Sequence, residues 1–330
     1  MKLSKPVKVG VIGVGHLGQH HVKHFASLTG ATLVGIYDLD ATRAREIAKQ
    51  YKTKSYSSVA ELLTDCNAIS IVTPTTQHAD IAEICIKSGK HVFIEKPITK
   101  TVAEADHLLS LTKKNRTVIQ VGHIERLNPA LLALSNFELK PKFIEVQRLA
   151  PYTARGTEVP VVLDLMIHDI DIILSLVDSP VKTIRASGVS IMTNSVDIAN
   201  ARIRFENGTV ANLTSSRVAQ NKVRKLKFFQ RDMYVTIDFL QGLTEVYRAI
   251  DSETQVTNAL VTAPLNNNGG HRAIVYEKPP IKKIDALRLE LTNFIESIQG
   301  HTKPIVDGQA GRDALEVATK IHTMIIEDVL

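Results

Sequence analysis

The stretch VKVGVIGVGHLG, Val7–Gly18, decides the fold of this 330-residue chain. A short apolar run with strand character leads into Gly13, Gly15 and Gly18, and a helical pattern follows. This is G-x-G-x-x-G in its required context, after a strand and before a helix. Gly13 permits the tight turn, Gly15 lets a pyrophosphate approach the backbone, and Gly18 lets the helix pack closely on the strand. The segment predicts a dinucleotide site, with the phosphates at the positive end of the helix.

An acidic residue follows at the distance that such a site requires. A second strand, Thr32–Tyr37, ends in Asp38, which lies 20 residues after Gly18 (38 − 18). An acid there hydrogen-bonds the adenine-side ribose of NAD, and it would repel the 2′-phosphate of NADP. Arg43 and Arg45 lie inside the next helix and could serve a phosphate only by bending back. The alternative is a glycine-rich turn of an unrelated doubly wound domain, with Asp38 merely opening that helix.

Composition places the chain among globular proteins of about two domains. It is 44% hydrophobic and 22% charged, and no run approaches the ~18 apolar residues of a membrane helix. We read no secretory signal and expect no membrane partner. Two cysteines, Cys66 and Cys85, make neither a disulfide framework nor a metal cluster, so we expect no metal and a reducing, cytoplasmic setting.

The formal net charge of +6 raises the question of a nucleic-acid partner. The basic residues are scattered except in Lys222–Lys227, where Val223 and Leu226 interrupt them. A strand with one solvated face explains this segment, and we expect no nucleic-acid binding. Sequence-blind, steeply salt-dependent binding would be the sign of the alternative.

Strands and helices alternate through the first 124 residues, which predicts a parallel sheet with helices on both faces. In such sheets the ligand lies beyond the carboxyl ends of the strands. Five segments fall at those ends. They are Gly13–Gly18, Asp38, Thr73-Pro74, Glu95-Lys96-Pro97 and Gly122-His123. Helices are expected at 41–50, 58–63, 77–87 and 102–113, and further strands at 68–72, 91–94 and 117–121.

The second half begins with a helix at Asn128–Phe137, a strand at Phe143–Leu149 and a helix between Pro160 and Pro180. Strand patterns then dominate, with hairpins at Asn207-Gly208 and Arg231-Asp232. We expect an α/β domain over 1–124, followed by an α+β domain over 125–330 with a large, mostly antiparallel open sheet. One face of that sheet needs a partner subunit, so a homodimer or homotetramer is expected. Residues 256–280 are expected to be irregular, as an active-site flap, and helices at 283–299 and 309–328 to pack back toward the first domain.

The helix between the two prolines carries a candidate acid–base pair. Asp164 and His168 are four residues apart and share a face, with Asp171 near the next turn. A carboxylate so placed holds an imidazole in one tautomer and stabilises its protonated form. The alternative is a polar helix edge with a fortuitous pair.

These motifs together resemble the glucose–fructose oxidoreductase/inositol dehydrogenase (Gfo/Idh/MocA) family. The resemblance rests on the glycine fingerprint with His21, on Thr73-Pro74 with His78, on Glu95-Lys96-Pro97, and on Asp164 and His168 as a D-x-x-x-H motif. It implies a Rossmann domain that binds NAD, and it places Lys96 beside the nicotinamide and the reacting hydroxyl. Without the resemblance, Lys96 reads equally well as a surface lysine before a turn proline.

The resemblance implies reversible oxidation of a secondary alcohol on a sugar or polyol. In one assignment His168, oriented by Asp164, accepts the proton while Lys96 stabilises the alkoxide. In the other, Lys96 is the base, with its pKa lowered by burial and the cationic ring. A free-sugar or inositol dehydrogenase and a non-catalytic dinucleotide-sensing regulator are the alternative functions.

Within the family, Gly122–Ala130 resembles the G-H-x-E-R-x-N-P segment of bacterial UDP-N-acetylglucosamine 3-dehydrogenases. This implies a nucleotide-sugar substrate. Arg126 could instead form a surface ion pair with Glu125 or Glu138, and Asn128 could simply cap its helix. The expected substrate contacts are Lys96, Arg126, Asn128, Tyr152, Arg155, Asp164 and His168. The expected cofactor contacts are Gly13, Gly15, His16, Leu17, Gly18, Asp38, Thr73, Pro74, His78, Glu95, Lys96 and His123.

Overall fold

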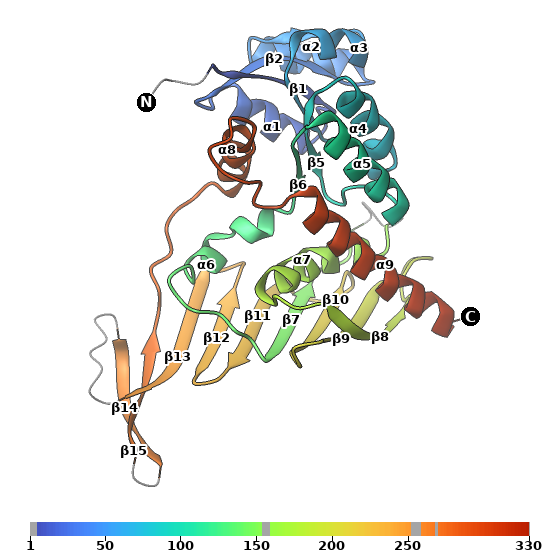
Figure 1. Cartoon of the computed structure of the whole chain (residues 1–330). Helices are drawn as coiled ribbons and strands as arrows, with labels where there is room; N and C mark the ends of the chain where they lie inside the picture. The colour runs from blue at the N-terminus through green and yellow to red at the C-terminus, as the bar shows by residue number, and fades with distance from the viewer. Residues whose placement is uncertain (1–4, 154–158, 252–258, 268–269, 330) are drawn as a thin grey trace. The chain divides into compact units, whose positions relative to one another are not determined.

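The computed structural model describes residues 5–153, 159–251, 259–267 and 270–329 (Figure 1). The chain divides into two compact units. The first contains the residues up to Ile124 and Asp285–Glu316, and the second contains Glu125–Ile284 and the residues from Val317 onward. The second domain was expected to cover 125–330, with its C-terminal helices packed back toward the first domain, and Asp285–Glu316 group with the first unit.

The first unit is built on a six-stranded sheet in the order β3-β2-β1-β4-β5-β6. Every pair of neighbours is parallel, and this order is that of a dinucleotide-binding Rossmann sheet. The predicted α/β fold is therefore confirmed. The strands are β1 (Val7–Ile12), β2 (Ala31–Tyr37), β3 (Lys54–Ser55), β4 (Ala68–Ile71), β5 (His91–Glu95) and β6 (Ile119–Gly122).

The helices of this unit begin where the sequence supplies caps. Asp40 and Ser58 cap their helices, and Thr101 forms a capping box with Glu104. These helices are α1 (Gly18–Phe25), α2 (Ala41–Gln50), α3 (Val59–Asp65), α4 (His78–Lys87), preceded by a 3₁₀ turn η1 (Thr75–Gln77), and α5 (Val102–Asn115).

A helix from the end of the chain completes this core. Helix α8 (Ala286–Ile298) buries Leu291 and Phe294 in the same cluster as Val9 and Phe25, and the rings of Phe93 and Phe294 meet edge to face at 5.8 Å. This apolar packing is why the segment belongs to the first unit. The last helix, α9 (Gly308–Val329), follows it.

The second unit is built on a nine-stranded sheet in the order β14-β15-β13-β12-β11-β7-β10-β9-β8. Among the strands that the structure describes in this sheet, only β7 and β10 pair in parallel, so the predicted mostly antiparallel sheet is confirmed. The strands are β7 (Phe143–Leu149), β8 (Val181–Val189), β9 (Ile198–Phe205), β10 (Val210–Ser216), β11 (Val223–Gln230), β12 (Met233–Asp238), β13 (Leu243–Asp251), β14 (Ala259–Asn267) and β15 (Gly270–Glu277).

The helical segments of this unit differ from expectation. Helix α6 covers only Pro129–Leu132, after a 3₁₀ turn η2 (Ile124–Leu127), so the expected helix to residue 137 was too long. The helix after Pro160 opens with a π-helical turn, η3 (Val162–Met166), and continues as α7 (Ile167–Leu176). Helical turns with wider hydrogen-bond spacing are frequent at functional sites.

Two further expectations about the strands have clear outcomes. Within the expected irregular stretch 256–280, the described residues of β14 and β15 pair as antiparallel strands, and Pro264 is tolerated since β14 is the edge strand. Lys222–Lys227 runs into β11, where Leu226 is buried and Lys225 is exposed, as predicted for a strand with one solvated face.

No helix in the described part of the chain has the length and apolar character to span a membrane.

Candidate functional site

The glycine loop has the geometry that the fingerprint predicts. Gly13 has φ +86°, and a Cβ there would lie 2.5 Å from the Val72 carbonyl oxygen. A Cβ on Gly18 would lie 1.9 Å from the Gly13 carbonyl oxygen. A Cβ on Gly15 would meet no protein atom within 4 Å. Packing within the protein therefore requires glycine at 13 and 18, while Gly15 faces open space.

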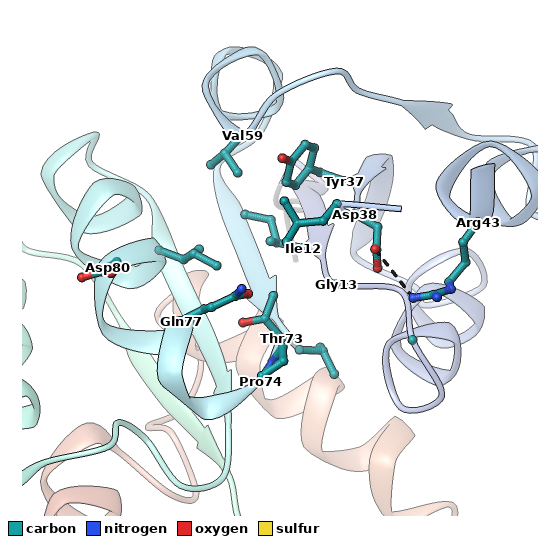
Figure 2. A pocket seen from close by; sticks show the side chains of 14 residues that line it. Ile12, Gly13, Tyr37, Asp38, Arg43, Val59, Thr73, Pro74, Gln77 and Asp80 are labelled. Carbon is teal, nitrogen blue, oxygen red and sulfur yellow. Dashed lines mark ion pairs between the residues drawn. The ribbon is translucent and has the colours of Figure 1, made fainter. Parts of the chain in front are cut away.

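That open space is a pocket of about 580 Å³ at the carboxyl ends of β1, β2 and β4 (Figure 2). Its wall is largely apolar and includes Ile12, Tyr37 and Val59, which suits a planar base. The Thr73 hydroxyl is buried in this wall and has no hydrogen-bond partner among the described residues. A buried polar atom of this kind marks a place where a ligand group can bond.

Asp38 connects the glycine loop to the edge of the pocket. Its Oδ2 accepts from the Val14 N–H at 2.7 Å, and its Oδ1 accepts from the Asp40 N–H at 2.9 Å. The guanidinium of Arg43 lies 3.7 Å from Asp38 Oδ1, the ion pair marked in Figure 2, and 3.0 Å from Asp40 Oδ2. Arg43 thus does bend back to line the pocket, whereas Arg45 donates to Thr42 on the exposed side of α2.

The Glu95-Lys96-Pro97 turn is held by a buried chain of polar groups. His21 on α1 places Nδ1 2.9 Å from Ser70 Oγ and Nε2 3.1 Å from Glu95 Oε1. Glu95 Oε2 accepts from the Lys96 N–H at 3.3 Å. Burial opposes ionisation of Glu95, but the hydrogen bond from His21 and the nearby charges of His21 and Lys96 outweigh it, so its pKa lies below the usual value. A Cβ on Gly122 would lie 2.9 Å from this carboxylate, so a larger residue would displace it.

His78 connects two segments at the strand ends. Its Nδ1 lies 2.9 Å from the Pro97 carbonyl oxygen, and its Nε2 lies 2.9 Å from the Thr73 carbonyl oxygen. Burial lowers the pKa of this imidazole. His78 is therefore an internal brace between the Thr73-Pro74 and Glu95-Lys96-Pro97 turns. Among the other expected cofactor contacts, His16 and Leu17 are exposed on the glycine loop, Pro74 lines the pocket, and His123 is buried after β6.

The acid–base candidates lie in the second unit. Asp164 belongs to the π-helical turn η3 and His168 to the first turn of α7, and both are half-buried. Tyr152 is exposed after β7, and Arg155 lies outside the described residues.

The two candidates on the Gly122–Ala130 segment have protein partners. Arg126 donates from Nε and Nη2 to the two carboxylate oxygens of Asp171, both at 2.7 Å, so its partner is neither Glu125 nor Glu138. Asn128 caps α6 by accepting from the Ala130 N–H at 3.0 Å, and its amide donates to Glu125. Among the described residues, no cluster of three or more His, Cys, Asp or Glu could hold a metal ion.

Two family models match this chain. Residues 7–123 match the NAD-binding Rossmann domain of the Gfo/Idh/MocA oxidoreductase family, and residues 145–235 match a C-terminal domain of the same family. The chain belongs to the Gfo/Idh/MocA family. It is an NAD-dependent oxidoreductase, and the glycine loop, Asp38 and Lys96 all lie in the NAD-binding part.

Similarity to individual members extends along the whole chain. The UDP-N-acetylglucosamine 3-dehydrogenase of Acidithiobacillus ferrooxidans is 36% identical over 320 residues, 97% of each chain. A solved structure of that protein has a TM-score of 0.86 and 35% identity, covering 98% of each chain. The myo-inositol 2-dehydrogenase of Thermotoga maritima is 24% identical over 328 residues, 94% of this chain and 93% of that one.

Two site features of this Gfo/Idh/MocA member were not expected from the sequence. Arg148 on β7 donates to both carboxylate oxygens of Asp169 at 2.8 Å, and neither residue was a candidate. The sequence did carry a signal, because Ile144, Val146 and Arg148 alternate onto one face of the strand, and that face is buried. The pocket-lining position of Arg43 depends on its side-chain rotamer, which no residue pattern specifies.

Proposed function

We propose that this enzyme oxidises the C3 hydroxyl of UDP-N-acetylglucosamine to the ketone, with NAD as the hydride acceptor. The observation that carries this proposal is the full-length similarity to a UDP-N-acetylglucosamine 3-dehydrogenase, at 36% identity over 97% of each chain. The G-H-x-E-R-x-N-P segment supports this substrate, because it resembles the segment of such dehydrogenases. The E-K-P turn and the D-x-x-x-H motif support an enzyme, because a dinucleotide sensor needs no acid–base groups.

The first unit fits the cofactor. The Asp38 carboxylate lies at the pocket edge for a ribose diol, and Gly15 leaves the phosphate side of the loop open. The Thr73 hydroxyl offers a hydrogen bond from the wall, and the N-terminus of α1 offers backbone N–H groups to the phosphates. NAD held there would supply the acceptor for the hydride of the carbinol carbon.

The proton of the substrate hydroxyl needs a separate acceptor. We assign this to His168, with Asp164 as the carboxylate that orients it, while the Lys96 ammonium stabilises the developing alkoxide. The assignment is supported by the shared helical segment of Asp164 and His168 and by the anchoring of Lys96 through Glu95. If Lys96 is instead the base, His168 variants retain the proton-transfer step and Lys96 variants lose it.

A substrate screen tests the function. It follows the reduction of NAD by the absorbance of reduced nicotinamide at ~340 nm. The candidates are UDP-N-acetylglucosamine, free sugars, inositols and small hydroxy acids. Wild type is compared with Lys96→Ala and with Lys100→Ala, a control that removes an exposed lysine from the same segment.

We expect turnover of the nucleotide sugar, reduced at least about 100-fold in Lys96→Ala and unchanged in the control. Equal rates for Lys96→Ala and wild type would remove Lys96 from the mechanism. Turnover of a free polyol alone would make the enzyme an inositol or sugar dehydrogenase. Tight NAD binding without turnover of any substrate would favour a sensor.

We further propose that the protein is a homodimer or homotetramer assembled through the nine-stranded sheet. Aromatic rings form a continuous row across five strands on one face, with neighbouring centroids 4.6 to 6.1 Å apart. Phe229 and Tyr247 in this row are 38% and 37% exposed. Figure 1 shows α6 and α7 together on one side of the sheet. An exposed aromatic row of this length favours an interface. The row consists of Phe143, Phe229, Tyr234, Tyr247 and Tyr276.

A cytoplasmic location completes the proposal. Cys66 and Cys85 are both free and buried, which accords with a reducing compartment.

A further inference from the structure

Two arginines hold helix α7, each through a buried ion pair with an aspartate of the helix. Arg126, from the turn η2, donates from Nε and Nη2 to Asp171 at 2.7 Å. Arg148, from strand β7, donates from the same two atoms to Asp169 at 2.8 Å. The Asp171 and Asp169 side chains are 1% and 2% exposed. Bidentate Arg–carboxylate pairs fix orientation as well as distance, because both N–H bonds lie in one plane.

The two ion pairs lie on either side of His168 around the helix. Successive residues of an α-helix are about 100° apart, so Asp169 is about 100° from His168 in one direction. Asp171, three residues on, is about 60° away in the other direction. One contact on each side of a helix opposes rotation about its axis in both senses. His168 therefore lies, around the helix, between two residues that are each held by an ion pair.

Glu125 links Arg126, its neighbour in the chain, to Arg148, which donates to its carboxylate. Its Oε1 accepts from Arg148 at 3.1 Å and from Arg224 on β11 at 3.2 Å, and its Oε2 accepts from the Asn128 amide at 3.1 Å. Glu125 and Arg126 are adjacent in the chain. One short turn thus holds Asp171 directly through Arg126 and Asp169 through Glu125 and Arg148.

We propose that Arg126 and Arg148 are positioning residues, which set the rotation and height of α7 and so place His168 for proton transfer. This inference rests on the proposed function and gives the E-R of the Gly122–Ala130 segment a role other than substrate contact. Small displacements of a proton acceptor are costly, since a shift of about 1 Å can lower a rate by about 100-fold. The clamp, defined as Arg126–Asp171 and Arg148–Asp169, does not need to touch the substrate.

The test compares Arg126→Met, Asp171→Asn and the double variant, with Arg126→Lys as the conservative change. Each is assayed for kcat and KM with UDP-N-acetylglucosamine and for hydrogen exchange of the α7 amides. We expect kcat to fall about 10- to 100-fold in each single variant with KM within about threefold of wild type. The double variant should fall no further, because both changes remove the same contact. Exchange over 167–176 should accelerate in all three, and Arg126→Lys should recover part of kcat.

Arg248→Met is the matched control, because it breaks the Arg248–Glu277 ion pair in the same sheet (Nε to Oε2, 2.8 Å), outside α7. It should change neither kcat nor α7 exchange. A KM increase of tenfold or more in Arg126→Met at unchanged kcat, with Asp171→Asn like wild type, would show substrate contact and overturn the proposal. So would unchanged kcat and exchange in both single variants.

Folding failure and failure of the proposed function are both distinguishable from failure of the clamp. If Arg126→Met does not fold, Arg126→Lys and Asp171→Asn decide by the same criteria. If wild type turns over no substrate, the proposed function fails, yet the exchange of α7 still decides whether the clamp holds the helix. Unchanged exchange in Asp171→Asn would then overturn the clamp itself.

Discussion

The Val14 N–H donates to Asp38 Oδ2 at 2.7 Å, so a hydrogen bond ties the glycine loop to the acid at the end of β2. Arg43 lies against the other oxygen of the same carboxylate, at 3.7 Å. We therefore expect the preference between NAD and NADP to depend on a pair of opposite charges at one pocket edge. The carboxylate repels a 2′-phosphate, and it also neutralises the arginine that could bind one.

Asp38→Asn should relax this preference. The amide oxygen can still accept from Val14, while the negative charge of Asp38 beside Arg43 is removed. Arg43 keeps its ion pair with Asp40, at 3.0 Å, but no longer faces a second carboxylate at 3.7 Å, so it can turn more readily to a phosphate. We expect the ratio of kcat/KM for NAD to that for NADP to fall at least about tenfold, equivalent to about 1.4 kcal/mol. Adding Arg43→Ala to Asp38→Asn should cancel any gain with NADP. If the double variant uses NADP as well as Asp38→Asn does, Arg43 has no part in cofactor choice.

Gly15→Ala and Gly18→Ala should separate cofactor binding from folding. A Cβ at 15 meets no protein atom within 4 Å, so this variant should melt like wild type but bind NAD at least about tenfold more weakly, because the methyl group enters the phosphate side of the pocket. A Cβ at 18 would lie 1.9 Å from a carbonyl oxygen and should lower the melting temperature itself. Thermal melts with and without NAD, alongside a direct NAD titration, measure both effects. Wild-type NAD affinity in Gly15→Ala would contradict the proposed loop geometry.

The sequence predicted those features that repeat with a regular period or need a particular residue. The glycine fingerprint, the cap at Asn128 and the strand Phe143–Leu149 were all confirmed, because turn sterics, capping and alternation act over a few residues. The sequence analysis expected the helix at 283–299 to pack toward the first domain, but not its partner, because the contact of Phe294 with Phe93 joins residues 201 positions apart (294 − 93).

The candidate site shows the same limit. Asp164 and His168 could be found from their spacing, but the π-helical turn that carries Asp164 leaves no mark in the hydrophobic pattern. The clamp on α7 was missed, because its partners come from η2, β7 and α7 and meet only in the folded unit. Strand β14 was not predicted, and it contains Pro264. Proline argues against a strand except at a sheet edge, and whether a strand lies at the edge is known only from the whole sheet.

The stability of the first unit should fall as pH drops below about 6.5, the ordinary pKa of histidine. Burial lowers the pKa of His78 in the native state, so below pH 6.5 the unfolded chain takes up a proton that the native His78 does not. The stability that neutral His78 contributes is complete above 6.5 and is lost as pH falls toward the native pKa. At pH 8, His78→Gln should lower the free energy of unfolding by about 1–3 kcal/mol, because it removes the hydrogen bond that His78 donates to the Thr73 or Pro97 carbonyl oxygen.

The difference between wild type and His78→Gln isolates this residue, because His24 and His91, whose pKa values are also lowered, titrate in both proteins. Urea unfolding at pH 8, 7, 6 and 5 should show the difference narrowing below pH 6.5. A difference that stays constant across this range would mean that native His78 takes up protons as readily as the unfolded chain does.

Breaking the aromatic row should dissociate the proposed oligomer without unfolding the subunit. The rings of Phe229 and Tyr234 stack with centroids 4.6 Å apart, and Tyr247 continues the row at 5.6 Å. Phe229→Asp and Tyr247→Asp place a charge on this face, where a symmetric interface would set it near its own copy. We expect the mass in solution, measured by light scattering, to fall to about that of one chain, 36.4 kDa.

Ile84→Asp, at an exposed apolar residue on α4, is the control and should leave the mass unchanged. An oligomer that survives both substitutions in the row would have to assemble through another surface, and a wild type already at 36.4 kDa would refute the assembly outright.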